Sequence, residues 1–443
     1  MKKIFYMLFL LISVSLISVS IVAASDVTDD IIGIENVDQS TAADMVIGEV
    51  EEDNTYFDAD LNRTMYEWDI KDFKRTPRDE RGPWTFVEVP DDEADNDGAD
   101  AVNKTIDGVI SAPGSIESNS SKNSSETRPY QMIILEKCIG PYTSEVRLVH
   151  DFAFDHRYDS YLKGGIVLNH SIVIEGNGHT LDGQGYSRFF NIVKDDIDVV
   201  IKNINFINGW AYDECGGAIL GNCKVINCTF KNNTIGFSGR GGAMYGGFAI
   251  NCLFEDNNEY CPDAHESVAG AMYGGTAIGC IFRNNFAGNG GAVCNCTVED
   301  SLFEGNNAQE NGGAAYNSTV KNSHFRLNIA KNNGGAACNC TVENSHFKAN
   351  KVEYVGGAVY GGIAKNSTFI RNEAGLGGAM SRGYAEDSTF VENRAHGAAA
   401  MLESSAVRCV FINNTPLAPN SVSILDSNVT DCTLNNDTVY TYE

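Results

Sequence analysis

Two pairs of cysteines are the first candidates for chemistry in this 443-residue chain, which contains 13 cysteines. Cys294 is paired with Cys296, and Cys338 with Cys340, and thiolates at such short spacing are typical of zinc sites. One unit of the repeat described below separates the pairs, so the expected distance between them is about 9–10 Å, too long for one tetrahedral zinc. We therefore interpret these cysteines as small buried thiols.

Two histidines are the second candidate. His324 and His346 occupy equivalent positions of adjacent repeat units, so their rings are expected to approach within about 5 Å on the outer surface. A two-histidine metal site or pH sensor is one interpretation. Unliganded surface residues are favoured, because no acidic third ligand is evident in that column. His179, in Gly-Asn-Gly-His-Thr, is assigned to a turn of an early coil and not to catalysis.

The elements that position these residues come from a repeat of 21 to 22 residues, which contains Gly-Gly-Ala, an aliphatic strand and Cys/Ser-x-Phe-x-x-Asn. Three successive copies span residues 290–311, 312–333 and 334–355. Repeats of this length indicate a solenoid, in which neighbouring units cover each other's apolar face. One aromatic occupies the same position in every unit: Phe206, Phe230, Phe254, Phe282, Phe303, Phe325, Phe347, Phe369, Phe390 and Phe411.

Within one copy the side chains alternate with a period of two residues, which predicts strands. Val342 and Phe347 are expected to point inward, and Glu343, His346 and Lys348 outward. Gly-Gly and Asn-Asn suit tight corners with positive φ, and no copy has room for a helix of about ten residues. The sequence therefore predicts an all-β fold, a right-handed parallel β-helix of roughly twelve coils stacked about 4.8 Å apart.

Four further columns are predicted from the same register. Small alanines follow the glycines, where the interior is narrow, and an inward Cys or Ser precedes each Phe by two residues. An Asn three residues after each Phe predicts a ladder of side-chain amides that hydrogen-bond coil to coil. Outside, basic and acidic residues alternate directly after Phe. The alanines are Ala218, Ala243, Ala271, Ala292, Ala314, Ala336, Ala358 and Ala379; the inward thiols and hydroxyls are Cys228, Cys252, Cys280, Ser301, Ser323, Ser345, Ser367, Ser388 and Cys409; the amides are Asn233, Asn257, Asn285, Asn306, Asn328, Asn350, Asn372, Asn393 and Asn414; the charges are Lys231, Glu255, Arg283, Glu304, Arg326 and Lys348.

The inward cysteines argue against a disulfide framework, although an exported chain permits one. Cys228, Cys252 and Cys280 are column neighbours whose Cβ vectors are expected to run parallel, which fits poorly with a disulfide dihedral of about 90°. Three cysteines outside the main column are the ones expected to form a bridge: Cys215, Cys223 and Cys261.

The N-terminal 25 residues have the composition of a secretory signal peptide. Lys2 and Lys3 precede a long apolar run, and small residues precede Asp26. An uncleaved membrane anchor is the alternative, because the run approaches the length that spans a bilayer.

An acidic segment follows. Residues 26–130 contain 27 Asp and Glu against 9 Lys and Arg, which accounts for 18 of the 27 net negative charges. Such a composition cannot bury enough apolar surface to fold, so a mostly disordered spacer is predicted over residues 26–132. The β-helix is predicted over residues 133–443, with its first strand near Ile133.

The repeats resemble those of known surface proteins. Gly-Gly-Ala-(Ile/Val/Met) and Phe-x-x-Asn look like the repeats of chlamydial polymorphic outer-membrane proteins. Residues 174–183, which read Ile-Glu-Gly-Asn-Gly-His-Thr-Leu-Asp-Gly, and the following segment 201–209 are similar to adhesin-like surface proteins of methanogenic archaea. The resemblance covers about residues 140–435 and implies a right-handed β-helix displayed on a cell surface. Neither a C-terminal membrane barrel nor a wall-anchoring module is evident up to Glu443, which leaves the means of retention open.

This resemblance implies an extracellular, adhesin-like and non-catalytic protein whose rod attaches to surface polysaccharide, glycoprotein or another cell. The net charge of −27 argues against nucleic acid as a partner, because the phosphate backbone would be repelled. We predict no catalytic, cofactor-binding or metal-binding residues. Glycosylation is permitted at fourteen Asn-x-Ser/Thr sequons, which include Asn227, Asn295, Asn317, Asn339 and Asn366.

A polysaccharide-acting enzyme, either a lyase or a glycoside hydrolase, is the alternative, because right-handed β-helices often host such enzymes. Hydrolysis needs paired carboxylates, and a lyase needs Ca²⁺-binding acids beside an Arg or Lys base. The adjacent acids of the early coils, Asp195 and Asp196, are expected in a loop before Ile197. Polygalacturonase-like Asn-Thr-Asp, Gly-His-Gly and Arg-Ile-Lys signatures are absent from the sequence.

Overall fold

The chain is divided into two units, the first ending at Ala94 and the second beginning at Asp95. In the first unit, β1 (Thr55–Asp58) and β2 (Arg63–Tyr66) pair as an antiparallel hairpin. The predicted signal peptide and most of the predicted spacer lie outside the described residues. No helix within the described residues is long and apolar enough to cross a membrane. The computed structural model describes residues 55–58, 63–66, 129–212, 215–236, 239–259 and 268–441.

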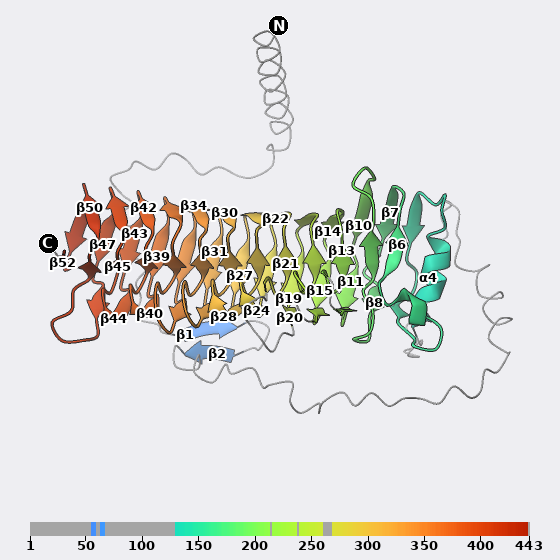
Figure 1. Cartoon of the computed structure of the whole chain (residues 1–443), viewed down its shortest axis with the longest axis horizontal. Coiled ribbons are helices and arrows are strands. Elements are labelled where there is room, and N and C mark those ends of the chain that lie inside the picture. Colours follow the sequence, from blue (N-terminus) through green and yellow to red (C-terminus); the bar gives the residue numbers. More distant parts are fainter. Residues whose placement is uncertain are drawn as a thin grey trace, which may run out of the picture. The chain divides into compact units, whose positions relative to one another are not determined.

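The second unit is a parallel β-helix, in which each coil repeats the same succession of short strands (Figure 1). One central coil contains β25 (Val293–Cys294), β26 (Thr297–Glu299), β27 (Leu302–Glu304) and β28 (Asn307–Asn311). Each strand pairs in parallel with its equivalent 22 residues later, so that Phe303 lies beside Phe325. The four resulting sheets are called I, II, III and IV in the order of these strands.

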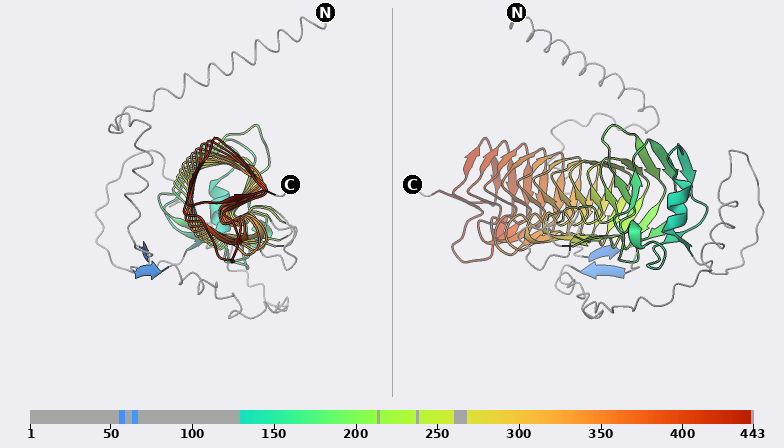
Figure 2. Two further views of the ribbon diagram at one scale, coloured as in Figure 1. Left: turned by 90° about the vertical axis from the view of Figure 1, so that its left-hand side faces the viewer. Right: turned by 45° about the vertical axis from the view of Figure 1, so that its right-hand side comes forward.

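The sheets extend along most of the β-helix. Within the described residues, sheets I and II have 13 strands each, sheet III has 14 and sheet IV has 10. The all-β parallel β-helix is thus confirmed, with about 13 coils against the predicted twelve. Viewed along the axis, successive coils superpose (Figure 2). The first and last strands are β6 (Ile166–Leu168) and β52 (Val439–Tyr440) in sheet I, β4 (Glu145–Arg147) and β50 (Asn428–Thr430) in sheet II, β3 (Tyr130–Gln131) and β51 (Thr433–Asn435) in sheet III, and β12 (Trp210–Ala211) and β48 (Thr415–Pro416) in sheet IV.

A helix covers the N-terminal end of the coils. The first strand, β3, lies close to the start predicted near Ile133, but Ile133 itself belongs to a helix that the sequence did not predict, α4 (Met132–Cys138), which lies at that end of the β-helix (Figure 1). Ile134 and Leu135 of the helix are buried in the same apolar core as the coils. The buried Asp159 carboxylate accepts a hydrogen bond from the N–H of Ile133 at 2.8 Å. The segment precedes the repeats, so no sequence period revealed it.

The phenylalanine column fills the interior as predicted. All ten rings of this column, from Phe206 to Phe411, are fully buried. Each ring stacks on the next, with centroids 4.5 to 5.0 Å apart. The predicted alanine and Cys/Ser columns are buried beside it. Burial of these apolar columns makes the main contribution to the free energy that holds the coils together.

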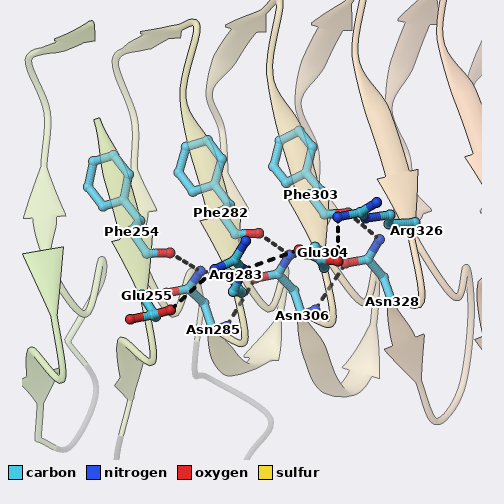
Figure 3. A network of polar contacts seen from close by, with 10 residues as sticks. All are labelled: Phe254, Glu255, Phe282, Arg283, Asn285, Phe303, Glu304, Asn306, Arg326 and Asn328. Carbon is cyan, nitrogen blue, oxygen red and sulfur yellow. Dashed lines mark hydrogen bonds and ion pairs between the residues drawn. The ribbon is translucent and has the colours of Figure 1, made fainter. Parts of the chain in front are cut away.

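The asparagine ladder is confirmed at the corner between sheets III and IV. Asn306 Oδ1 accepts hydrogen bonds from the backbone N–H of Asn285 at 3.0 Å and from its side-chain amide at 2.9 Å (Figure 3). Asn306 Nδ2 donates to the carbonyl oxygen of Phe282 at 2.9 Å and to Asn328 Oδ1 at 3.0 Å. Because a side-chain amide both donates and accepts hydrogen bonds, each Asn can accept from the Asn of one neighbouring coil and donate to the Asn of the other.

The paired glycines allow sheet IV to approach sheet I closely. Gly312 has φ +63°, a conformation that L side chains rarely adopt. A Cβ atom on Gly313 would lie 2.6 Å from the carbonyl oxygen of Ile329, which belongs to the sheet IV strand of the same coil. Glycine fits both positions without strain, so most copies carry two, whereas Ala269 takes the first position in one coil and Ala398 and Ala399 take both in another.

The register predicts different costs for two neighbouring substitutions. Phe325 is fully buried between Phe303 and Phe347, whereas His324 is exposed. Phe325→Ala should destabilise the protein by about 3–5 kcal/mol through the cavity it opens, and His324→Ala should be nearly neutral. Thermal unfolding monitored by far-UV circular dichroism compares the two. Equal shifts in midpoint would contradict the observed register.

Candidate functional site

Sheet III carries a ladder of opposite charges on its outer face. Glu255 contacts Lys231 at 2.5 Å and Arg283 at 3.6 Å. Glu304 contacts Arg283 at 3.1 Å and Arg326 at 2.6 Å (Figure 3). The predicted alternation is therefore confirmed from Lys231 to Arg326, and it is wrong at Lys348, which pairs in register with the like-charged Arg326. Since each carboxylate lies between two cations, the ladder neutralises itself. It offers a charged partner little net attraction.

The two predicted histidines are brought together on the same face. The rings of His324 and His346 stack with centroids 4.9 Å apart, and His346 Nδ1 lies 2.5 Å from the hydroxyl of Thr368. Partial burial and the neighbouring His324 ring lower the pKa of His346. In the described part of the chain, no cluster of three or more His, Cys, Asp and Glu side chains could hold a metal ion.

A column of tyrosines on the outer face of sheet I is the feature that sequence reasoning missed. Tyr273, Tyr316 and Tyr360 alternate with Cys294 and Cys338, one residue per coil in continuous parallel register. A fourth member, Tyr245, stacks on Tyr273 with ring centroids 5.4 Å apart. We call these four tyrosines the tyrosine stripe. Each follows the glycine pair, or the Ala-Gly at 269–270, at the same offset in the repeat, and this periodicity is the signal that could have revealed the stripe.

The tyrosines lean across the following coil. The Tyr273 hydroxyl accepts a hydrogen bond from Asn295 Nδ2 at 2.8 Å, and the Tyr360 hydroxyl accepts one from Arg382 Nη1 at 3.0 Å. Tyr316 bonds in the same way to Asn339. Each of these partners stands at the corner after sheet I, one coil further along. The rings of Tyr273, Tyr316 and Tyr360 therefore cross the small side chain of the next coil.

That small side chain is buried beneath the ring. Cys294 and Cys338 are 2% and 3% exposed, and burial raises the pKa of each thiol to about 12. Both thiols stay protonated near neutral pH, so they are poor metal ligands and nucleophiles. Their partners in the predicted pairs, Cys296 and Cys340, are buried as well. The interpretation of all four as buried thiols is confirmed.

The cysteines expected to form bridges have different outcomes. Cys223 is a buried free thiol, so the expected bridge is wrong for this residue; burial in the apolar core explains its position outside the main column. Cys215 is half-buried, and its bridge stays a prediction together with that of Cys261, which lies outside the described residues. Cys228, Cys252 and Cys280 are free thiols in the inward column, as the parallel Cβ vectors predicted.

The sequon asparagines occupy strained corners of the coil. Asn227, Asn295, Asn317, Asn339 and Asn366 are exposed and have φ between 46° and 54°. Asparagine is one of the few residues that adopts this left-handed region readily. The backbone conformation therefore explains why Asn recurs there, and sugar attachment stays a prediction.

One cavity lies at the N-terminal end of the β-helix and has a volume of ≈ 310 Å³. The ring of Tyr186 lies between those of Phe154 and His156, with centroids 6.1 Å and 6.0 Å away. Asp155 is the one carboxylate among its lining residues, and its Oδ1 already accepts the N–H of Arg157 at 3.0 Å. Asp195 and Asp196 lie in a loop, as predicted, and do not line this cavity.

No family model and no curated protein sequence matches the chain. Tailspike protein 3 of bacteriophage CBA120 is similar in structure, with 10% identity and a TM-score of 0.38 over 72% of this chain and 61% of the tailspike chain. The A-module of a mannuronan C-5 epimerase from Azotobacter vinelandii has 12% identity and a TM-score of 0.28 over 70% of this chain and 93% of that module. A polygalacturonase from Erwinia carotovora has 11% identity and a TM-score of 0.18 over 74% of this chain and 98% of that enzyme.

At TM-scores of 0.38 and below, these likenesses assign no activity. The fold implied by the resemblance to adhesin-like proteins is the fold that the structure has. The function must therefore be argued from the outer faces of this chain.

Ser381 offers a test of the packing beneath the stripe. It lies under Tyr360 in the place that Cys338 takes two coils earlier, and its fully buried hydroxyl has no hydrogen-bond partner among the described residues. Ser381→Cys should raise stability by about 1 kcal/mol, because a buried hydroxyl without a partner is costly. The midpoint of thermal unfolding measures the gain. Ser345→Cys is the control, since Ser345 Oγ donates to Glu343 O at 2.9 Å, and an equal gain there would contradict the explanation.

The histidine pair predicts a pH dependence. Because the folded pKa of His346 is below the unfolded value of about 6.5, the unfolded state binds more protons between the two values. Stability should be full above about pH 6.5 and fall as the pH drops through the folded pKa. Thermal melts of the wild type and His346→Gln from about pH 8 to 5 should show a smaller loss in the variant. Identical pH profiles would exclude any contribution from the pair.

Proposed function

We propose that this protein is an exported, non-catalytic, adhesin-like rod that binds extended polysaccharide on a surface through the tyrosine stripe. The stripe carries the proposal: four half-buried aromatic rings lie in line on one face, and hydrogen bonds fix the far ends of Tyr273, Tyr316 and Tyr360. Fixed amphipathic rings offer contact area at low cost in conformational entropy. The C–H face of a sugar ring packs on such a surface, and its hydroxyls reach the polar rim.

A repeated surface suits a repeated ligand. Each coil adds one position to the stripe at a spacing of about 4.8 Å, so a polymer that lies along the rod meets several weak contacts at once. Overall affinity then exceeds the affinity of any single contact. Placement at the cell surface follows in this proposal from the predicted signal peptide and acidic spacer, which would hold the rod away from its point of retention.

The N-terminal cavity favours a second candidate, the polysaccharide-acting enzyme. His156 and Tyr186 could exchange protons with a sugar bound there, with Asp155 nearby. Hydrolysis by the common mechanisms uses two carboxylates, and the cavity is lined by one. Release of reducing ends or unsaturated sugars from polysaccharides, lost in His156→Ala, would support this candidate over the binding rod.

The binding proposal is tested with three stripe residues changed together, Tyr273→Ala, Tyr316→Ala and Tyr360→Ala. The purified chain should lose about tenfold or more of its retention on immobilised polysaccharides, because the contacts act together. Three exposed threonines on the neighbouring outer face of sheet II serve as the matched control: Thr297→Ala, Thr319→Ala and Thr341→Ala. If both triple variants bind equally well, the stripe is not the binding surface.

Localisation has its own test. Labelling intact cells with a membrane-impermeant reagent should modify the protein, and deleting its gene should weaken attachment to a surface or partner cell. Recovery of the protein from the cytoplasm alone would contradict the proposal.

A further inference from the structure

We infer that the tyrosine stripe selects an uncharged, extended glycan of β-1,4-linked type, whose ring faces recur every second sugar along the β-helix axis. The inference rests on the proposed function, because it names the ligand class of the same surface.

The spacing of the stripe sets the period of the ligand. Tyr273, Tyr316 and Tyr360 are two coils apart, with Cys294 and Cys338 between them in register. At about 4.8 Å per coil, an equivalent ring recurs about every 9.6 Å. In an extended β-1,4-linked chain successive sugars face opposite ways, so the same ring face recurs once per disaccharide. A coiled α-1,4-linked chain turns its faces away and cannot follow a straight stripe.

The tilt of the rings leaves them suited to stacking. Each tyrosine crosses the next coil to its corner residue, as Tyr273 does to Asn295 and Tyr360 to Arg382. A ring held at its far end in this way leans along the rod, and we take its outward face as the surface that a ligand contacts. Small residues between the rings are what make this tilt fit, because a bulky side chain at Cys338 would lift Tyr316 from the surface.

Polar groups along the stripe are arranged for hydroxyls. The oxygen of Tyr273 accepts hydrogen bonds from Arg240 Nη1 at 3.0 Å and from Asn295 Nδ2 at 2.8 Å. Because both acceptor positions of the Tyr273 oxygen are used, the hydroxyl proton of Tyr273 is directed to a ligand oxygen. Exposed corner amides continue the rim on three consecutive coils, at Asn295, Asn317 and Asn339.

The charges beside the stripe favour an uncharged ligand. Arg382 is neutralised by Glu403 at 2.7 Å, and Arg240 lies 5.0 Å above the ring of Tyr273. These arginines are several coils apart, so they do not form the row of cations that a polyanion needs. The net charge of −27 adds a general repulsion of anionic polymers.

The experiment compares soluble oligosaccharides by calorimetry with the full chain. The probes are β-1,4-linked N-acetylglucosamine, glucose and mannose oligomers of two to seven units, with α-1,4-linked glucose oligomers and oligogalacturonate as comparators. Three tyrosines that each contact every second sugar span five sugars. Affinity for at least one β-1,4 series should therefore rise about tenfold or more from the disaccharide to the pentasaccharide and then level off. The comparators should bind at least about tenfold more weakly.

A swap of two residues tests the spacing itself. The double variant Tyr316→Cys with Cys338→Tyr keeps the number of tyrosines but places two of them on adjacent coils, an arrangement that Tyr245 and Tyr273 already show to fit. This variant should lose the rise in affinity from the disaccharide to the pentasaccharide. Tyr384→Ala, on the outer face of sheet II, should keep that rise. A thermal melt confirms that each variant is folded. If the double variant is not folded, Tyr316→Phe takes its place, with an expected severalfold loss of affinity for the β-1,4-linked oligomers.

Each outcome separates the two proposals. Equal binding of α-1,4-linked or anionic oligomers, or an unchanged chain-length profile in the swapped variant, overturns the inferred ligand class and leaves glycan binding by the stripe in place. Absence of binding to every probe overturns the ligand class too. Loss of retention on immobilised polysaccharide in the triple tyrosine variant would then still support the proposed function.

Discussion

In-register stacking of parallel coils is the constraint on which the rest of this structure depends. Each residue pairs with its equivalent one coil later, so every buried column must pack against copies of itself. Phenylalanine meets this demand by stacking, and asparagine meets it because its amide both donates and accepts. The corners need positive φ at the same place in every coil, which explains the recurring asparagines and glycines.

The same constraint has a different effect on the outer faces, where identical neighbours are often unfavourable. On sheet III the charges from Lys231 to Arg326 alternate in sign, because like charges one coil apart would repel. On sheet I the tyrosines alternate with small residues, because each leaning ring needs room above the next coil. In these two columns the one-coil period of the interior thus becomes a period of two coils on the outer face.

The proposed function depends on the length of the rod and not on one deep pocket. In this proposal the stripe adds weak contacts along a line, and the hydrogen bonds between rings and corner residues hold the rings in place without further ordering on binding. The self-neutralised ladder of sheet III and the two histidines lie on another face. The proposed binding surface and the ion-pair ladder therefore lie on separate faces of the same coil.

The repeat alone determined the strands, the inward and outward positions, the Phe and Asn ladders and the charge ladder, because each is a local pattern with a fixed period. It could not reveal α4, since the capping helix lies outside the repeats and is defined by the apolar end it covers. Nor did it reveal the tyrosine stripe. Tyr273, Tyr316 and Tyr360 become a surface only when parallel pairing aligns them with Cys294 and Cys338, because their tilt depends on side chains one coil away and not on neighbours in sequence.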